Sequence, residues 1–156
     1  MLTRTYKLAA MAVLATASLS ASASEWKTET KYDEFIGKNV LTMSLQDGNT
    51  VSANVKCSSG AAYVTLDSTI ILSRRSKASI EWVSGALRGT VQGSTKGRYF
   101  TAGGYGLVDV FKAADSMYKP VKVRFRSDYN GDVKVRQFDT EGFTSAYLEF
   151  SKYCGN

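Results

Sequence analysis

The sequence predicts a mainly β domain, arranged as a sandwich-like meander on which one or two helices pack. Three observations lead to this prediction. Apolar and polar residues alternate along several stretches, which is the period of a half-buried strand. Turn-forming residues, mostly glycine and asparagine, separate those stretches. Only two segments, 107–117 and 140–153, carry apolar residues at helical spacing.

The first 23 residues predict a cleaved secretory signal peptide. Arg4 and Lys7 form a basic start, residues 8–19 are uncharged and mostly apolar, and small residues end in an A-x-A pattern at Ala23. The apolar stretch is shorter than the roughly 20 residues that span a bilayer. We therefore expect cleavage after Ala23, a periplasmic location without a transmembrane anchor, and a single β-rich domain over residues 24–156.

A β-hairpin is predicted where Leu41, Met43 and Leu45 alternate with polar residues ahead of Asp47-Gly48-Asn49. A three-residue loop, with Asn49 in the left-handed conformation, would pair Leu45 with Val51, Met43 with Ala53 and Leu41 with Val55. That register keeps the apolar residues of both strands on one face, whereas a two-residue turn would not.

A third strand follows the turn at Ser59-Gly60, which pairs Cys57 with Ala62 and completes a meander. Further strands are expected at 69–72 and 78–83. Beyond them, four glycines recur every four residues, at Gly85, Gly89, Gly93 and Gly97. Because charged and polar residues lie between these glycines, they predict turns and bent strands and not a packed membrane helix.

The two helical segments flank a second hairpin over residues 121–138. The first, 107–117, stops before Pro120, because proline cannot continue a helix. The second, 140–153, opens with Asp139-Thr140-Glu141, a combination typical of a capped N-terminus.

Cys57 and Cys154 are the two cysteines of the chain. In an exported protein such a pair predicts one disulfide, because the compartment is oxidising. The bond would tie the terminal helix to the meander. The alternative is two free, buried thiols.

Composition excludes many enzyme classes. The chain has no histidine, which excludes Ser-His-Asp and Cys-His catalytic systems and most zinc sites. Lysine and arginine total 20 against 14 acidic residues, and cleavage leaves 18 against 14, a charge of about +4. With so small a charge and no recognised motif, we expect no nucleic-acid partner. We expect no cofactor and no enzyme activity, although a carboxylate-based hydrolase would need only two acids.

Two local motifs have simpler structural interpretations. Ser116 and Lys119 match the S-x-x-K spacing of a lysine-activated serine, but they fall at a predicted helix end and the supporting motifs are missing. Asp128, Asn130 and Asp132 resemble the start of a calcium loop, but the later positions of that loop do not match. A three-residue hairpin loop with Gly131 in the left-handed conformation explains that segment better.

The same loop would place five basic residues on one face of the second hairpin and pair Arg126 with Lys134 and Arg124 with Arg136. These candidate partner-binding residues are Lys122, Arg124, Arg126, Lys134 and Arg136. Like charges opposite each other are unfavourable, so one interpretation is a docking stripe for an anionic partner. The other is a face that neighbouring acids neutralise, or a solvated face that protects a sheet edge.

The chain resembles small exported bacterial proteins, notably the periplasmic accessory family associated with type VI secretion and similar prophage-encoded proteins. The matching features are Trp26, the segment 51–66 with Cys57 at a strand end, Ile80-Glu-Trp, and the ending from Phe138-Asp-Thr-Glu-Gly-Phe143 to Cys154. The Gly-rich middle and the basic hairpin depart from that family. The resemblance implies a β-sandwich-like domain with a terminal helix and a Cys57–Cys154 pair.

We therefore expect a non-enzymatic periplasmic binding or accessory module that contacts an envelope protein, the secretion machinery or an anionic envelope surface. Two alternatives stay open at this point. One is a prophage-type exclusion factor or an inhibitor of an envelope hydrolase. The other is a carboxylate-based hydrolase of cell-wall glycan.

Overall fold

The computed structural model describes residues 24–58, 60–73, 77–103 and 106–154. The predicted signal peptide, residues 1–23, lies outside the described residues. Within the described ranges, no helix is both long enough and apolar enough to span a bilayer.

The described chain is mainly β, as predicted, with nine antiparallel strands in one open sheet and two helices. The strand order across the sheet is β1-β2-β3-β4-β7-β6-β5-β8-β9. The strands are β1 (Trp26–Asp33), β2 (Lys38–Asp47), β3 (Thr50–Ser58), β4 (Ala61–Asp67), β5 (Ala78–Ser84), β6 (Leu87–Lys96), β7 (Tyr99–Gly103), β8 (Val121–Arg126) and β9 (Val133–Phe138), and the helices are α1 (Leu107–Ser116) and α2 (Phe143–Cys154).

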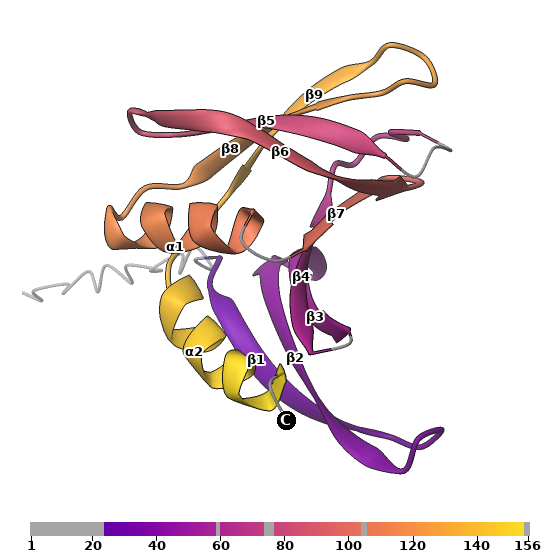
Figure 1. The fold of residues 1–156 in the computed structure, drawn as a ribbon, viewed down its shortest axis with the longest axis vertical. Helices are drawn as coiled ribbons and strands as arrows, with labels where there is room; N and C mark the ends of the chain where they lie inside the picture. The colour runs from indigo at the N-terminus through magenta and orange to yellow at the C-terminus, as the bar shows by residue number, and fades with distance from the viewer. Residues whose placement is uncertain (1–23, 59, 74–76, 104–105, 155–156) are drawn as a thin grey trace, which may run out of the picture.

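The sheet has two halves whose strands run in different directions (Figure 1). β1 to β4 form the lower half in this view, β5, β6, β8 and β9 form the upper half, and β7 lies between them. Both helices lie on the same side, where α2 packs on β1 and β2, and α1 packs on α2, β4 and β8. The domain is thus one continuous sheet made of two halves, and both helices pack on its inner face.

Aromatic side chains fill the core between the helices and the sheet. Trp26, at the start of β1, is 2% exposed and meets Phe111 of α1 and Phe143 of α2 edge to face, with ring centroids 5.4 and 4.9 Å away. Its indole Nε1–H donates to the carbonyl oxygen of Asp139 at 2.9 Å, so the polar end of the ring is satisfied. Trp26 thereby joins the first strand to both helices.

The disulfide between Cys57 and Cys154 is present and joins the end of α2 to β3, as predicted. The β3–β4 register is also confirmed, because Cys57 lies opposite Ala62. In addition, β5 and α1 occupy the predicted segments to within one residue, and the second predicted helix also forms, over a shifted range.

The β2–β3 loop differs from the prediction. Asp47 lies opposite Thr50, so the turn has two residues, and Gly48, with a φ of +60°, holds the left-handed position expected for Asn49. The predicted pairs are shifted by two residues: Leu45 lies opposite Ala53 and Met43 opposite Val55. A β-bulge makes this possible, because Ser52 is the extra residue that places Ala53 and Val55 on the same face as Leu45 and Met43. Val51, which was predicted on that face, is 46% exposed.

Two element boundaries also differ from the prediction. Residues 69–72 form no strand, because Thr69 adopts a φ of +66°. Helix α2 begins at Phe143 and not at residue 140, since Gly142 has a φ of +77°. The predicted cap is replaced by a tertiary one, in which the backbone N–H of Thr144 donates to Oδ2 of Asp115 from α1 at 2.9 Å.

Asp67, only 5% exposed, connects segments that are distant in the sequence. Its carboxylate accepts two hydrogen bonds from the Arg98 guanidinium and one from the N–H of Thr69, and its carbonyl oxygen accepts one from Arg136 of β9. Burial alone would raise the pKa of Asp67. The hydrogen bonds from Arg98 and Thr69 and the charges of both arginines outweigh burial and hold that pKa below its usual value of 3.8.

Replacing Asp67 with Asn is expected to lower the free energy of unfolding by about 2 kcal/mol at neutral pH, because the neutral amide loses the charge-assisted hydrogen bonds that the buried carboxylate accepts from Arg98. Since the folded pKa of Asp67 is depressed, its contribution is full above pH 3.8 and is lost as the pH falls through the folded value. Urea unfolding across this pH range measures the effect. Asp128→Asn, an exposed change on the neighbouring loop, is the control. Equal stability losses in the two variants would contradict the assigned role of Asp67.

Candidate surface for a binding partner

The β8–β9 hairpin has a register one residue away from the prediction. Arg126 lies opposite Val133, Arg124 opposite Val135, and Phe125 opposite Lys134. The predicted pairs of Arg126 with Lys134 and Arg124 with Arg136 are therefore wrong. The loop is longer than three residues, because the N–H of Ser127 donates to the carbonyl oxygen of Asp132 at 2.8 Å.

This register divides the five predicted partner-binding residues between the two faces of the sheet. Lys122, Arg124 and Arg126 alternate with the buried residues of β8 and are exposed on its outer face. Lys134 and Arg136 lie opposite the buried residues Phe125 and Val123, and so belong to the inner face at the sheet edge. Arg136 has a structural role there, because its guanidinium donates to the carbonyl oxygen of Asp67 and lies 5.3 Å from the Phe138 ring centroid.

The outer face of β6, β5, β8 and β9, hereafter the basic face, is not covered by either helix (Figure 1). Arg88 of β6 lies opposite Val83, which lies opposite Lys122. In the next row, Glu81 lies opposite Arg124 and pairs with it, with the Arg124 Nη1 and Glu81 Oε2 atoms 2.9 Å apart. The register thus adds Arg88 to the group of basic residues on this face.

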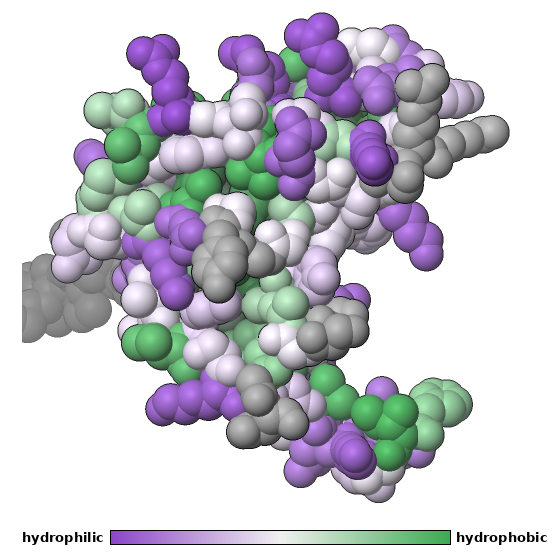
Figure 2. All heavy atoms as spheres, in the orientation of Figure 1, coloured by the Kyte–Doolittle hydropathy of each residue, from purple (hydrophilic) through white to green (hydrophobic). Residues whose placement is uncertain are grey.

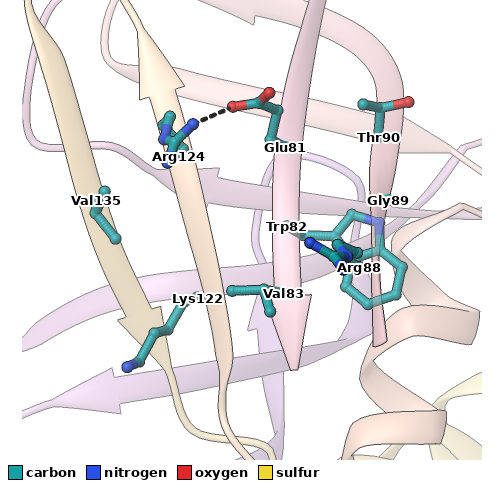
Figure 3. Close-up of a pocket in the computed structure, with 9 residues that line it drawn as sticks. All are labelled: Glu81, Trp82, Val83, Arg88, Gly89, Thr90, Lys122, Arg124 and Val135. Carbon is teal, nitrogen blue, oxygen red and sulfur yellow. Dashed lines mark hydrogen bonds and ion pairs between the residues drawn. The ribbon is translucent and has the colours of Figure 1, made fainter. Parts of the chain in front are cut away.

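A shallow pocket of about 510 Å³ opens on the basic face. Figure 3 shows Arg124 reaching toward Glu81, while the Trp82 ring extends across to Gly89 on the next strand. Among the described residues that line the pocket, Glu81 is the only carboxylate, against Arg88, Lys122 and Arg124. Val83 and Val135, 39% and 55% exposed, add apolar surface. In Figure 2, hydrophilic side chains project along the upper edge, over the same half of the sheet.

The S-x-x-K motif and the segment that resembles a calcium loop have structural roles. The Ser116 hydroxyl donates to the carbonyl oxygen of Ala113 at the end of α1. In the β8–β9 loop, Asn130 Nδ2 donates to Asp132 Oδ2 at 2.7 Å, and Gly131 has the predicted left-handed conformation, with a φ of +78°. In the described part of the chain, no three acidic, cysteine or histidine residues gather as a metal site would require.

An exposed apolar turn between β1 and β2 was not predicted from the sequence. Phe35 is fully exposed and Ile36 is 58% exposed, at the end of the long hairpin at the lower right of Figure 1. Asp33 Oδ1 accepts hydrogen bonds from both backbone N–H groups, which fixes the turn. Asp33 at the first turn position and Gly37 at the last were the available sequence signals.

The chain matches no protein-family model, no curated protein and no solved structure.

Proposed function

We propose that this protein is a non-enzymatic periplasmic binding or accessory module that docks an acidic envelope protein on its basic face. One observation carries the proposal: on an uncovered sheet face, β6 and β8 place Arg88, Lys122 and Arg124 around a pocket with one carboxylate, and Arg126 lies on the same face of β8. The Cys57–Cys154 disulfide supports the periplasmic location, because such bonds persist in oxidising compartments.

A protein fits this face better than a lipid surface does. Arg124 and Arg126 lie opposite exposed valines of β9, and a protein partner supplies both carboxylates and apolar side chains to cover them. A bilayer surface presents mainly headgroup charge, which would not cover the valines. The exposed basic groups also steer an acidic partner toward the face, so association is expected to weaken with ionic strength.

The triple variant Arg88→Gln, Lys122→Gln, Arg126→Gln is expected to reduce partner capture about tenfold or more, because it removes three positive charges and spares the Arg124–Glu81 ion pair. The measurement is quantitative mass spectrometry of proteins crosslinked to the purified chain in envelope extract. The matched control, Lys27→Gln, Lys31→Gln, Lys38→Gln, makes the same change in net charge on β1 and β2, away from the basic face.

Equal capture by the triple variant and its control would reject the basic face as the docking surface. Binding to anionic vesicles but to no protein would reject the protein partner. Turnover of purified peptidoglycan by the wild type, lost in Glu81→Gln, would contradict a non-enzymatic role.

A further inference from the structure

A second concave surface lies on the outer face of β3, β4 and β7, away from the basic face. It is a pocket of about 560 Å³ on the side of the sheet opposite the core. Figure 2 shows the outline of the molecule hollowed on the side where Figure 1 places these strands, above the β1–β2 turn. Although no helix covers this face, Asn54, Tyr63 and Thr65 on it are only partly exposed. Neighbouring side chains therefore cover these three residues in part, and together they line the pocket.

A row of uncharged polar side chains crosses the floor of this pocket. Asn54 of β3 lies opposite Thr65 of β4, which lies opposite Thr101 of β7. The two threonine hydroxyl oxygens are 3.0 Å apart and share a hydrogen bond. The Asn54 Oδ1 atom has no hydrogen-bond partner among the described residues, although it is buried. Hydroxyl and amide groups in a row are the donors and acceptors that match the hydroxyl groups of a sugar.

Two tyrosines lie on either side of the polar row. Tyr63 lies opposite Gly103, and a Cβ atom at Gly103 would come within 2.7 Å of the Tyr63 Cδ1 atom. The ring therefore lies across the glycine of the neighbouring strand, in a position that a larger residue would not allow. Tyr99, two residues before Thr101, is 45% exposed. An aromatic ring beside a polar row offers a flat apolar surface on which the C–H face of a pyranose can pack.

The charges of the pocket select an anionic ligand. Lys56 and Lys96 line it, and no carboxylate is among its described lining residues. Asp67, on the same face of β4, is already bound by Arg98. Any carboxylate or phosphate on a ligand would therefore meet positive charge here without an opposing acid.

We propose that this pocket binds an anionic oligosaccharide, with Tyr99 and Tyr63 as stacking surfaces, the polar row as hydrogen-bonding groups, and Lys56 and Lys96 as partners of the acidic groups. An extended glycan suits the site because the pocket is open and runs across several strands. This site is separate from the basic face, and either proposal can fail without the other.

The test uses the full mature chain and a defined probe, an oligogalacturonate hexamer, in which every sugar carries a carboxylate. Titration followed by amide chemical shifts in NMR spectra is expected to show saturable changes on β3, β4 and β7, with a dissociation constant on the order of 1 mM or below. Maltohexaose, which has the sugar rings without charge, and inorganic phosphate, which has charge without the sugar rings, are each expected to bind at least about tenfold more weakly.

Tyr99→Ala is expected to weaken oligogalacturonate binding about tenfold, and Lys56→Gln with Lys96→Gln by a similar factor. Tyr118→Ala is the matched control, because Tyr118 is 93% exposed at the end of α1, away from the pocket. Unchanged thermal unfolding of Tyr99→Ala shows that a loss of binding is local. Three results would overturn the proposal: no shifts at about 10 mM oligogalacturonate, equal binding of the neutral probe, or full binding by folded Tyr99→Ala.

Discussion

Removal of the Cys57–Cys154 disulfide is expected to lower the free energy of unfolding by about 4 kcal/mol, the largest effect of any change predicted here. The bond joins residues 97 positions apart, so it restricts the unfolded chain strongly. In the folded state it fastens the last residue of α2 to β3, while Phe143 and Phe150 bury the inner side of the same helix. Urea unfolding of the oxidised wild type and of Cys57→Ala with Cys154→Ala measures the difference.

The reduced wild type is the control for this double variant. Both proteins lack the covalent link, so their unfolding midpoints are expected to agree, and adding reductant is expected to leave the double variant unchanged. A wild-type midpoint that does not move under reductant would show that the bond contributes nothing to stability. The expected loss is a large part of the 5–15 kcal/mol typical of small domains, so the reduced chain is expected to lose much of its stability.

Sequence patterns correctly predicted the strands that pair with the next strand along the chain. Cys57 and Ala62 pair as expected because a short turn and strict alternation leave one register that buries Val55 and Val64 together. Helix α1 was predictable because its apolar spacing ends at a proline. The same reasoning failed at β2–β3, because the bulge at Ser52 shifts the register, so that Val51 is 46% exposed and Ser52 is buried.

The candidate surface could not be predicted from the alternation of apolar and polar residues along each strand. β9 is an edge strand on which Phe138 is buried but Val133, Lys134 and Val135 are all exposed, so apolar and polar residues do not alternate in a way that shows its register. The observed register brings Arg136 to the carbonyl oxygen of Asp67, a contact between residues 69 positions apart. No local pattern predicts such a contact. Arg88 was missed for a similar reason, since its place beside Val83 and Lys122 depends on the order of three strands.

Replacing Gly93 with Ala is expected to destabilise the fold by about 3 kcal/mol, because the added methyl group has no space. An ideal Cβ at this position would lie 2.5 Å from Cζ of Phe100 and even closer to the backbone carbonyl oxygen of Thr101. Phe100 is fully buried and the carbonyl belongs to β7, so neither can move without disturbing the core or the sheet. Thermal or urea unfolding measures the change.

Gly89→Ala is the matched control, on the same strand and the same face. There the Cβ would lie 3.1 Å from the Trp82 Nε1 atom, and Trp82 is a partly exposed side chain that can shift, so a loss of about 1 kcal/mol or less is expected. The contrast separates the two functions of the four-residue glycine repeat. Gly85 and Gly97 provide turns with positive φ, whereas Gly89 and Gly93 leave room for aromatic rings from neighbouring strands. If Gly93→Ala and Gly89→Ala lose equal stability, the close approach of Phe100 and Thr101 does not set Gly93 apart, and the packing explanation is wrong.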